Sequence, residues 1–273
     1  MVDQALPPWG DDPLSTFLSN AQWNERALGV NVPDLYALLQ RVHGVFERVA
    51  AITERESNEH LLPTRLLMAR AHAAWLAAVR MGMSGQVVET YPLVRMVVEN
   101  SWYALHLAKD SAPPTRAELW LRRSDDDAAE SRCATEFSIS NVRKTHAALD
   151  PSNERAMHEV YRRTIAFGGH LNERGVLSAT TRMETDETYT YAVAQLTDRP
   201  LLITTALKAT IEAAVGALRT EKLLNRDMRH ARRRSRPMPV FLTGRNPHNV
   251  AFADLLGPTA PLPNPACASR QPS

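Results

Sequence analysis

The sequence is poor in cysteine, in aromatic residues and in net charge. Its two cysteines, Cys133 and Cys267, are far apart and form no C-x-x-C pair, which excludes a disulfide framework and a cysteine-based zinc site. Aromatic residues make up only 6% of the chain, whereas Ala, Leu, Val and Met are plentiful; this composition favours helices over a β-sandwich. The formal net charge of +2 gives no overall field that points to nucleic acid.

A long hydrophobic run is also missing. The most apolar window, Ala73–Val79, is flanked by His72 and Arg80 and is far shorter than the roughly 20 residues that a membrane span needs. The N-terminus is acidic and lacks the basic start and apolar stretch of a secretory signal. We therefore expect a soluble, cytoplasmic protein that does not enter a membrane.

The 273 residues, 44% of them hydrophobic, are enough for a substantial core. Apolar residues recur at steps of three and four, which predicts a mainly α fold, a helical bundle. We predict an irregular lead over 1–32, a bundle domain over 33–225 and a flexible tail over 226–273. Pro92 lies inside the most apolar segment, so a helix either begins there or kinks there. Thr, Tyr and Val around the polar "ETDE" predict a small β-hairpin near 177–195.

The tail is first basic and then rich in proline. Six arginines fall between Arg226 and Arg236, and such a run either attracts phosphate or is a solvated helix end. No aromatic residue stands among these arginines, so base stacking is not indicated.

The stretch "RRTIAFGGHLNERG", residues 162–175, holds the first candidate site. On a continuous helix, Arg163 and His170 would be two turns apart and share a face. His170 could transfer a proton near neutral pH, and Arg163 could bind phosphate oxygens; Asn172 follows as a polar candidate. The alternative is structural: Gly168 and Gly169 end the helix, and His170 caps its last carbonyls.

The second candidate is a charged pair in an apolar setting. Arg95 and Glu99 lie four residues apart in "YPLVRMVVENSWY", so they face the same side of a helix. Buried charges need partners. The pair therefore either supports a polar network inside the bundle or lines a pocket, and Tyr161 and His170 are candidates to join it.

The order of "YPLVRMVVENSWYALHLAKD", then "YRRTIAFGGHLNERG", a β-prone stretch and a long helix resembles a group of uncharacterised bacterial helical proteins related to the HEPN superfamily. The resemblance covers roughly residues 60–225. It implies a helical bundle, and many active members are metal-independent ribonucleases whose motif is an arginine, four to six residues, then a histidine. Arg163 and His170 fit that motif at its upper limit, with Thr164 where Asn, Asp or His is usual. The resemblance implies RNA as a partner and a toxin or phage-defence context.

Other reaction classes are not supported. His158 and Glu159 are followed by Arg162 where the H-E-x-x-H zinc motif needs histidine, and the chain has no G-x-x-x-x-G-K-[ST] loop, no G-x-G-x-x-G turn and no G-x-S-x-G elbow. We predict no metal site and no cofactor. Two interpretations stay open: an RNA-binding or RNA-cleaving bundle, and a non-catalytic bundle that binds a protein, a small molecule or a second copy of the chain.

Overall fold

A computed structural model describes residues 10–53, 61–109, 115–169, 175, 177, 180–184 and 188–232. These residues are mainly α-helical, as the sequence predicts. The chain divides at Ala231 and Arg232 into two units, and the described residues lie almost wholly in the first.

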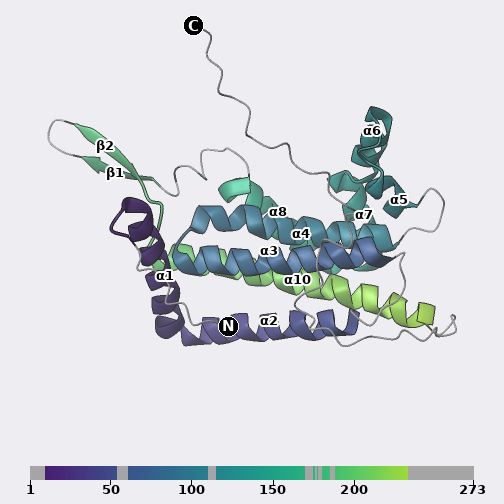
Figure 1. Ribbon diagram of the computed structural model, residues 1–273, viewed down its shortest axis with the longest axis horizontal. Helices are drawn as coiled ribbons and strands as arrows, with labels where there is room; N and C mark the ends of the chain where they lie inside the picture. Colours follow the sequence, from purple (N-terminus) through teal and green to yellow (C-terminus); the bar gives the residue numbers. More distant parts are fainter. Residues whose placement is uncertain are drawn as a thin grey trace, which may run out of the picture. The chain divides into compact units, whose positions relative to one another are not determined.

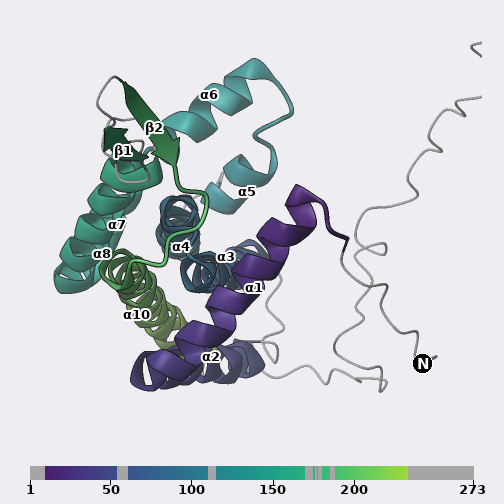
Figure 2. The same cartoon turned by 90° about the vertical axis from the view of Figure 1, so that its left-hand side faces the viewer.

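Long helices run alongside one another in this unit (Figures 1 and 2). They are α2 (Pro33–Thr53), α3 (Leu62–Ser84), α4 (Val87–Ala108), α8 (Pro151–Thr164) and α10 (Pro200–Arg232). The helix α1 (Pro13–Asn31) crosses one end of this group, and three shorter helices lie toward the other end (Figure 1). The shorter helices are α5 (Arg116–Leu121), α6 (Asp127–Glu136) and α7 (Ile139–Leu149).

The core is built around α4, the most apolar of the predicted helices. Its inward residues are completely buried: Val94, Val97, Val98, Trp102 and Leu105. The facing side of α3 presents small buried residues such as Ala71 and Ala78, so the two helices pack closely, as the run of small residues in α3 predicts. Each fully buried large apolar side chain stabilises the fold by roughly 1.5–3 kcal/mol.

Pro92 lies within α4, which begins five residues earlier at Val87. Of the two alternatives for Pro92, a helix start is therefore excluded. Proline has no N–H to donate to the carbonyl of Val88, one turn back. Gly168 approaches that same carbonyl so closely that a Cβ at position 168 would lie 2.5 Å from the oxygen. A residue without a side chain is required there.

The predicted irregular lead is also wrong over most of its length, because Pro13–Asn31 forms α1. The carboxylate of Asp12 caps this helix by accepting the N–H groups of Leu14 and Ser15. Ala21 is the buried residue of the helix, whereas Trp23 and Val30 are largely exposed. Apolar residues do recur at helical steps on one face of α1, but Trp23 and Val30 lie on the opposite face, so the apolar stripe is not one-sided.

The predicted hairpin is present. The strands β1 (Thr180–Glu184) and β2 (Tyr189–Val193) pair antiparallel, with Thr180 opposite Val193 and Glu184 opposite Tyr189. At the other predicted boundary, α10 continues seven residues beyond the expected end of the bundle at 225, to Arg232. Residues 233–273, which hold most of the predicted tail, lie outside the described residues.

Within the described part of the chain, one stretch is long and apolar enough to span a membrane, Pro200–Leu224 of α10. Half of its most apolar window is buried against the rest of the bundle. Core helices of soluble proteins have the same length and composition, so this stretch is weak evidence for a membrane span.

Candidate functional site

Arg163 lies in the last turn of α8. This helix begins with Pro151, and the side chain of Asp150 caps it by accepting the N–H of Asn153 at 2.9 Å. Apolar and polar residues segregate strongly along α8, so that Met157 and Val160 face the core. The two arginines at its C-terminal end interact favourably with the helix dipole.

The guanidinium of Arg163 joins α8 to α10. It forms an ion pair with Glu212 of α10, and its Nε lies 3.5 Å from the carbonyl oxygen of Glu159. Both charged side chains keep about a third of their surface exposed, 29% for Arg163 and 35% for Glu212. Burial raises the pKa of the nearby Tyr91 phenol, and the positive charge of Arg163 opposes that rise.

Beyond Thr164 the chain leaves the α-helix in a wide turn, η2 (Ile165–Gly169). Gly168 has non-helical backbone angles, and Phe167 stacks on Tyr91 with ring centroids 5.5 Å apart. The condition of a continuous α-helix from Arg163 to His170 is therefore not met, because the α-helix ends at Thr164, before the glycines. His170 and Asn172 lie outside the described residues, so the structure places only the arginine of the predicted pair.

Arg95 and Glu99 make the side-chain contact that their spacing predicts. The Nε of Arg95 donates to Oε1 of Glu99 at 2.7 Å, and the guanidinium carbon lies 5.3 Å from the centre of the Tyr161 ring. Burial raises the pKa of Tyr161; the charge of Arg95 opposes this shift and that of Glu99 adds to it. Tyr161 also packs against Trp102, which connects the pair to the core.

This pair lies at the rim of the bundle rather than inside it. The side chains of Arg95 and Glu99 are 24% and 29% exposed, so water still solvates part of both charges. Burial lowers the pKa of Arg95, but the hydrogen bond and the charge of Glu99 outweigh that effect and raise it overall. Arg95, Glu99 and Tyr161 thus form a polar network, which we call the rim network.

A second polar network, which sequence reasoning missed, surrounds the buried His106. Its Nδ1 lies 2.7 Å from Oγ1 of Thr145, and its Nε2 lies 3.1 Å from Oε1 of Glu136. Arg116 donates to the same carboxylate oxygen at 2.6 Å. Burial and then the charge of Arg116 lower the pKa of His106, so a neutral imidazole suits this position. The partners come from α4, α5, α6 and α7, and no sequence spacing connects them.

A third network is sealed between α7, α8 and α10. Asn153 Nδ2 lies 3.1 Å from Nε2 of His146, 3.0 Å from the carbonyl oxygen of Gly216 and 3.3 Å from Oγ1 of Thr220. Burial lowers the pKa of His146 to about 4. The neighbouring α10 residue Glu221 is also buried, and burial raises its pKa to about 7.

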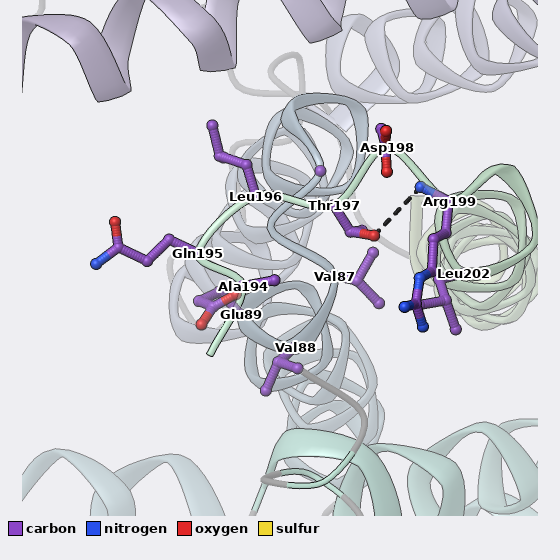
Figure 3. Close-up of a pocket in the computed structure, with 11 residues that line it drawn as sticks. Val87, Val88, Glu89, Ala194, Gln195, Leu196, Thr197, Asp198, Arg199 and Leu202 are labelled. Carbon is purple, nitrogen blue, oxygen red and sulfur yellow. Dashed lines mark hydrogen bonds between the residues drawn. The ribbon is translucent and has the colours of Figure 1, made fainter. Parts of the chain in front are cut away.

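A small cavity of about 190 Å³ lies where the segment after β2 crosses the start of α4 (Figure 3). The N–H of Thr197 donates to the carbonyl of Gly85 at 3.0 Å. Gly85 has a φ of 92°, in the left-handed region that favours glycine, and a Cβ there would lie 2.4 Å from the carbonyl oxygen of Thr197. Val87 and Val88 supply apolar walls, so the cavity has the character of a packing gap beneath a crossing segment.

No family model, no curated protein and no solved structure matches this chain.

Proposed function

We propose that this chain is a cytoplasmic, HEPN-like protein that cleaves RNA without a metal ion, with Arg163 as the phosphate-binding group and His170 as the proton-transfer group. The observation that carries the proposal is the position of Arg163. Its guanidinium is partly exposed at the end of α8, is held by Glu212 from α10, and precedes a wide turn whose last residue, Gly169, adjoins His170 in sequence.

The contacts of Arg163 are compatible with phosphate binding. A guanidinium has five N–H donors, and within the described residues Arg163 uses one toward Glu212 and one toward the carbonyl of Glu159. The remaining donors can meet phosphate oxygens, while Glu212 fixes the orientation of the group. A preoriented cation of this kind stabilises charge that develops in a transition state.

The proposed reaction is transesterification at phosphorus. Neutral His170 takes the proton of a ribose 2′-hydroxyl, and the 2′-oxygen attacks the adjacent phosphorus. The bond from phosphorus to the 5′-oxygen of the next nucleotide breaks; that oxygen takes up a proton from water, and His170 returns to solvent the proton that it removed. The products are a 2′,3′-cyclic phosphate and a free 5′-hydroxyl, while Arg163 stabilises the charge on the phosphoryl oxygens.

The test is cleavage of labelled single-stranded RNA by the purified full-length chain in the presence of EDTA. We expect cleavage by the wild type and a loss of at least about 100-fold in Arg163→Ala and in His170→Ala, in line with the usual contribution of proton transfer. The double variant should be little worse than either single one, because the two groups act as a unit. DNA of the same sequence should stay intact, because it lacks the 2′-hydroxyl.

Arg162→Ala is the matched control. Arg162 is adjacent in sequence, is 69% exposed and pairs only loosely with Glu159, at 3.8 Å. It should retain wild-type cleavage. Equal loss in Arg162→Ala and Arg163→Ala would mean that general positive charge on α8 matters rather than one positioned guanidinium. Cleavage that persists in both Arg163→Ala and His170→Ala would refute the assignment.

Two observations favour the second candidate, a non-catalytic binding bundle. Glu212 already neutralises Arg163, as in a purely structural ion pair, and an apolar groove of about 650 Å³ lies between α1, α2 and α3, with Val30, Tyr36 and Leu76 in its lining. If the folded wild type cleaves no RNA, this second function is the better account.

A further inference from the structure

A cluster of metal-ligand side chains joins α2 to α3, away from the residues discussed above. His43 and Glu47 are one turn apart on α2 and so project from the same face. His72 comes from α3. One ligand atom from each of the three residues lies within 4.8 Å of the other two. Sequence reasoning predicted no metal site, because no short motif contains residues 29 positions apart.

The distances suit a small divalent ion. Nδ1 of His43 and Nε2 of His72 are 3.1 Å apart. Two imidazole nitrogens at the usual 2.0–2.1 Å from a tetrahedral zinc ion lie about 3.3 Å from each other. Oε1 of Glu47 lies 4.0 Å from Nδ1 of His72, the ring nitrogen that does not face His43, and the Glu47 side chain is 62% exposed. It can therefore swing onto an ion by changing rotamers, without disturbing any packed group.

The ring of His72 is held in place by aromatic neighbours. Phe46 is buried and stacks on it with centroids 4.5 Å apart and planes 10° apart. Trp75, also buried, lies on the same side at 6.1 Å. An imidazole that is fixed before the ion arrives loses little freedom on binding. The His72 side chain is 15% exposed, so an ion can reach it from solvent.

From this geometry we infer that His43, Glu47 and His72 bind a zinc ion that links α2 to α3. Two imidazoles and one carboxylate form a His₂Glu ligand set, and a water molecule completes the tetrahedron. Without an ion, the 3.1 Å contact is a hydrogen bond between the two imidazoles, one donating and one accepting. With an ion, both nitrogens turn lone pairs toward the metal, and each ring carries its proton on the other nitrogen.

The test is titration of Zn²⁺ into the EDTA-treated, dialysed full-length chain, followed by calorimetry. We expect one site with a Kd in the micromolar range or below. His43→Gln and His72→Gln should each weaken it at least tenfold, and Glu47→Gln severalfold. His158→Gln on α8 is the control and should bind Zn²⁺ as the wild type does. Co²⁺ should give the intense visible absorption of a four-coordinate site in the wild type and not in His72→Gln.

Two results would overturn the inference. Undiminished Zn²⁺ binding by both histidine variants would place the ion elsewhere in the chain. No binding by a wild type that is folded by circular dichroism would mean that the two histidines only hydrogen-bond to each other. Because the Glu47 side chain is mostly exposed, Glu47→Gln should fold normally, and unchanged affinity in that variant would exclude the carboxylate as a ligand. This site is independent of the proposed RNA cleavage, which is assayed in chelator.

Discussion

Polar groups occupy two contrasting regions of this bundle. Between α7, α8 and α10 they are sealed from solvent: His146, Asn153 and Thr220 are buried. Glu221, elsewhere on α10, is buried as well. At the rim, Arg95, Glu99, Arg163 and Glu212 keep between a quarter and about a third of their side chains exposed. A sealed polar group must be satisfied by the protein, because water cannot replace a lost partner. Substitutions in the sealed region should therefore lower the free energy of unfolding strongly. Substitutions at the rim should lower it little, so rim side chains can take part in function.

The largest effect should come from breaking the sealed network at Asn153. Asn153→Ala leaves the ring nitrogen of His146 without its donor and opens a gap beside Gly216 and Thr220, so we expect a loss of about 3 kcal/mol in the free energy of unfolding. Urea unfolding measures it. Asn141→Ala is the control, because Asn141 makes a comparable 3.0 Å bond to the carbonyl of Thr135 at the surface. Equal losses in the two variants would contradict the distinction between sealed and rim groups.

An effect of comparable size should appear in the pH dependence of stability. The pKa of Glu221 rises from 4.5 to about 7, so the folded state binds its proton more tightly than the unfolded state does. Its contribution is therefore lost as pH rises from about 4.5 to about 7, by about 3 kcal/mol. His146 acts in the opposite direction: its pKa falls from 6.5 to about 4, so stability is lost as pH falls through that interval.

Between pH 4.5 and 6.5 the contributions of Glu221 and His146 to the free energy of unfolding change with pH in opposite directions, so wild-type stability should change little. Glu221→Gln should remove the loss of stability that Glu221 causes as pH rises. This variant should therefore become less stable as pH falls from 6.5, and it should be more stable than the wild type at pH 8. His146→Gln should show the reverse. Chemical unfolding at a series of pH values measures both. Parallel pH profiles for the wild type and Glu221→Gln would mean that the carboxyl is solvated.

The smallest effect on stability should come from the rim. Arg95→Ala should cost about 1 kcal/mol or less, the usual range for a solvent-exposed ion pair. If the pair lay fully inside the bundle, the loss would instead be about 3 kcal/mol or more. Thermal and urea unfolding of Arg95→Ala distinguish the two values. A loss of 3 kcal/mol would show that Glu99 becomes an uncompensated buried charge when its partner is removed.

Local patterns allowed much of the fold to be predicted. The steps of three and four between apolar residues predict the helical bundle, the Thr-rich and Tyr-rich arms predict the hairpin, and a spacing of four predicts the contact of Arg95 with Glu99. The helix α1 was missed because Trp23 and Val30, on the face opposite its apolar residues, obscure the one-sided pattern. The partner of Arg163 could not be predicted, because Glu212 is 49 residues away and meets it only when α8 packs beside α10. The same holds for His43 and His72, which approach each other only through the packing of α2 on α3.

The central claim is that two rim arginines with similar exposure have different roles. Arg95 and Arg163 are 24% and 29% exposed, and each pairs with a glutamate, so their alanine variants should have similar stability. The most direct test is the rate of RNA cleavage in EDTA by Arg163→Ala and Arg95→Ala, compared at equal concentrations of folded protein. The account predicts a loss of at least about 100-fold for Arg163→Ala and less than about threefold for Arg95→Ala. Equal rates in the two variants, or no cleavage by the folded wild type, would contradict it.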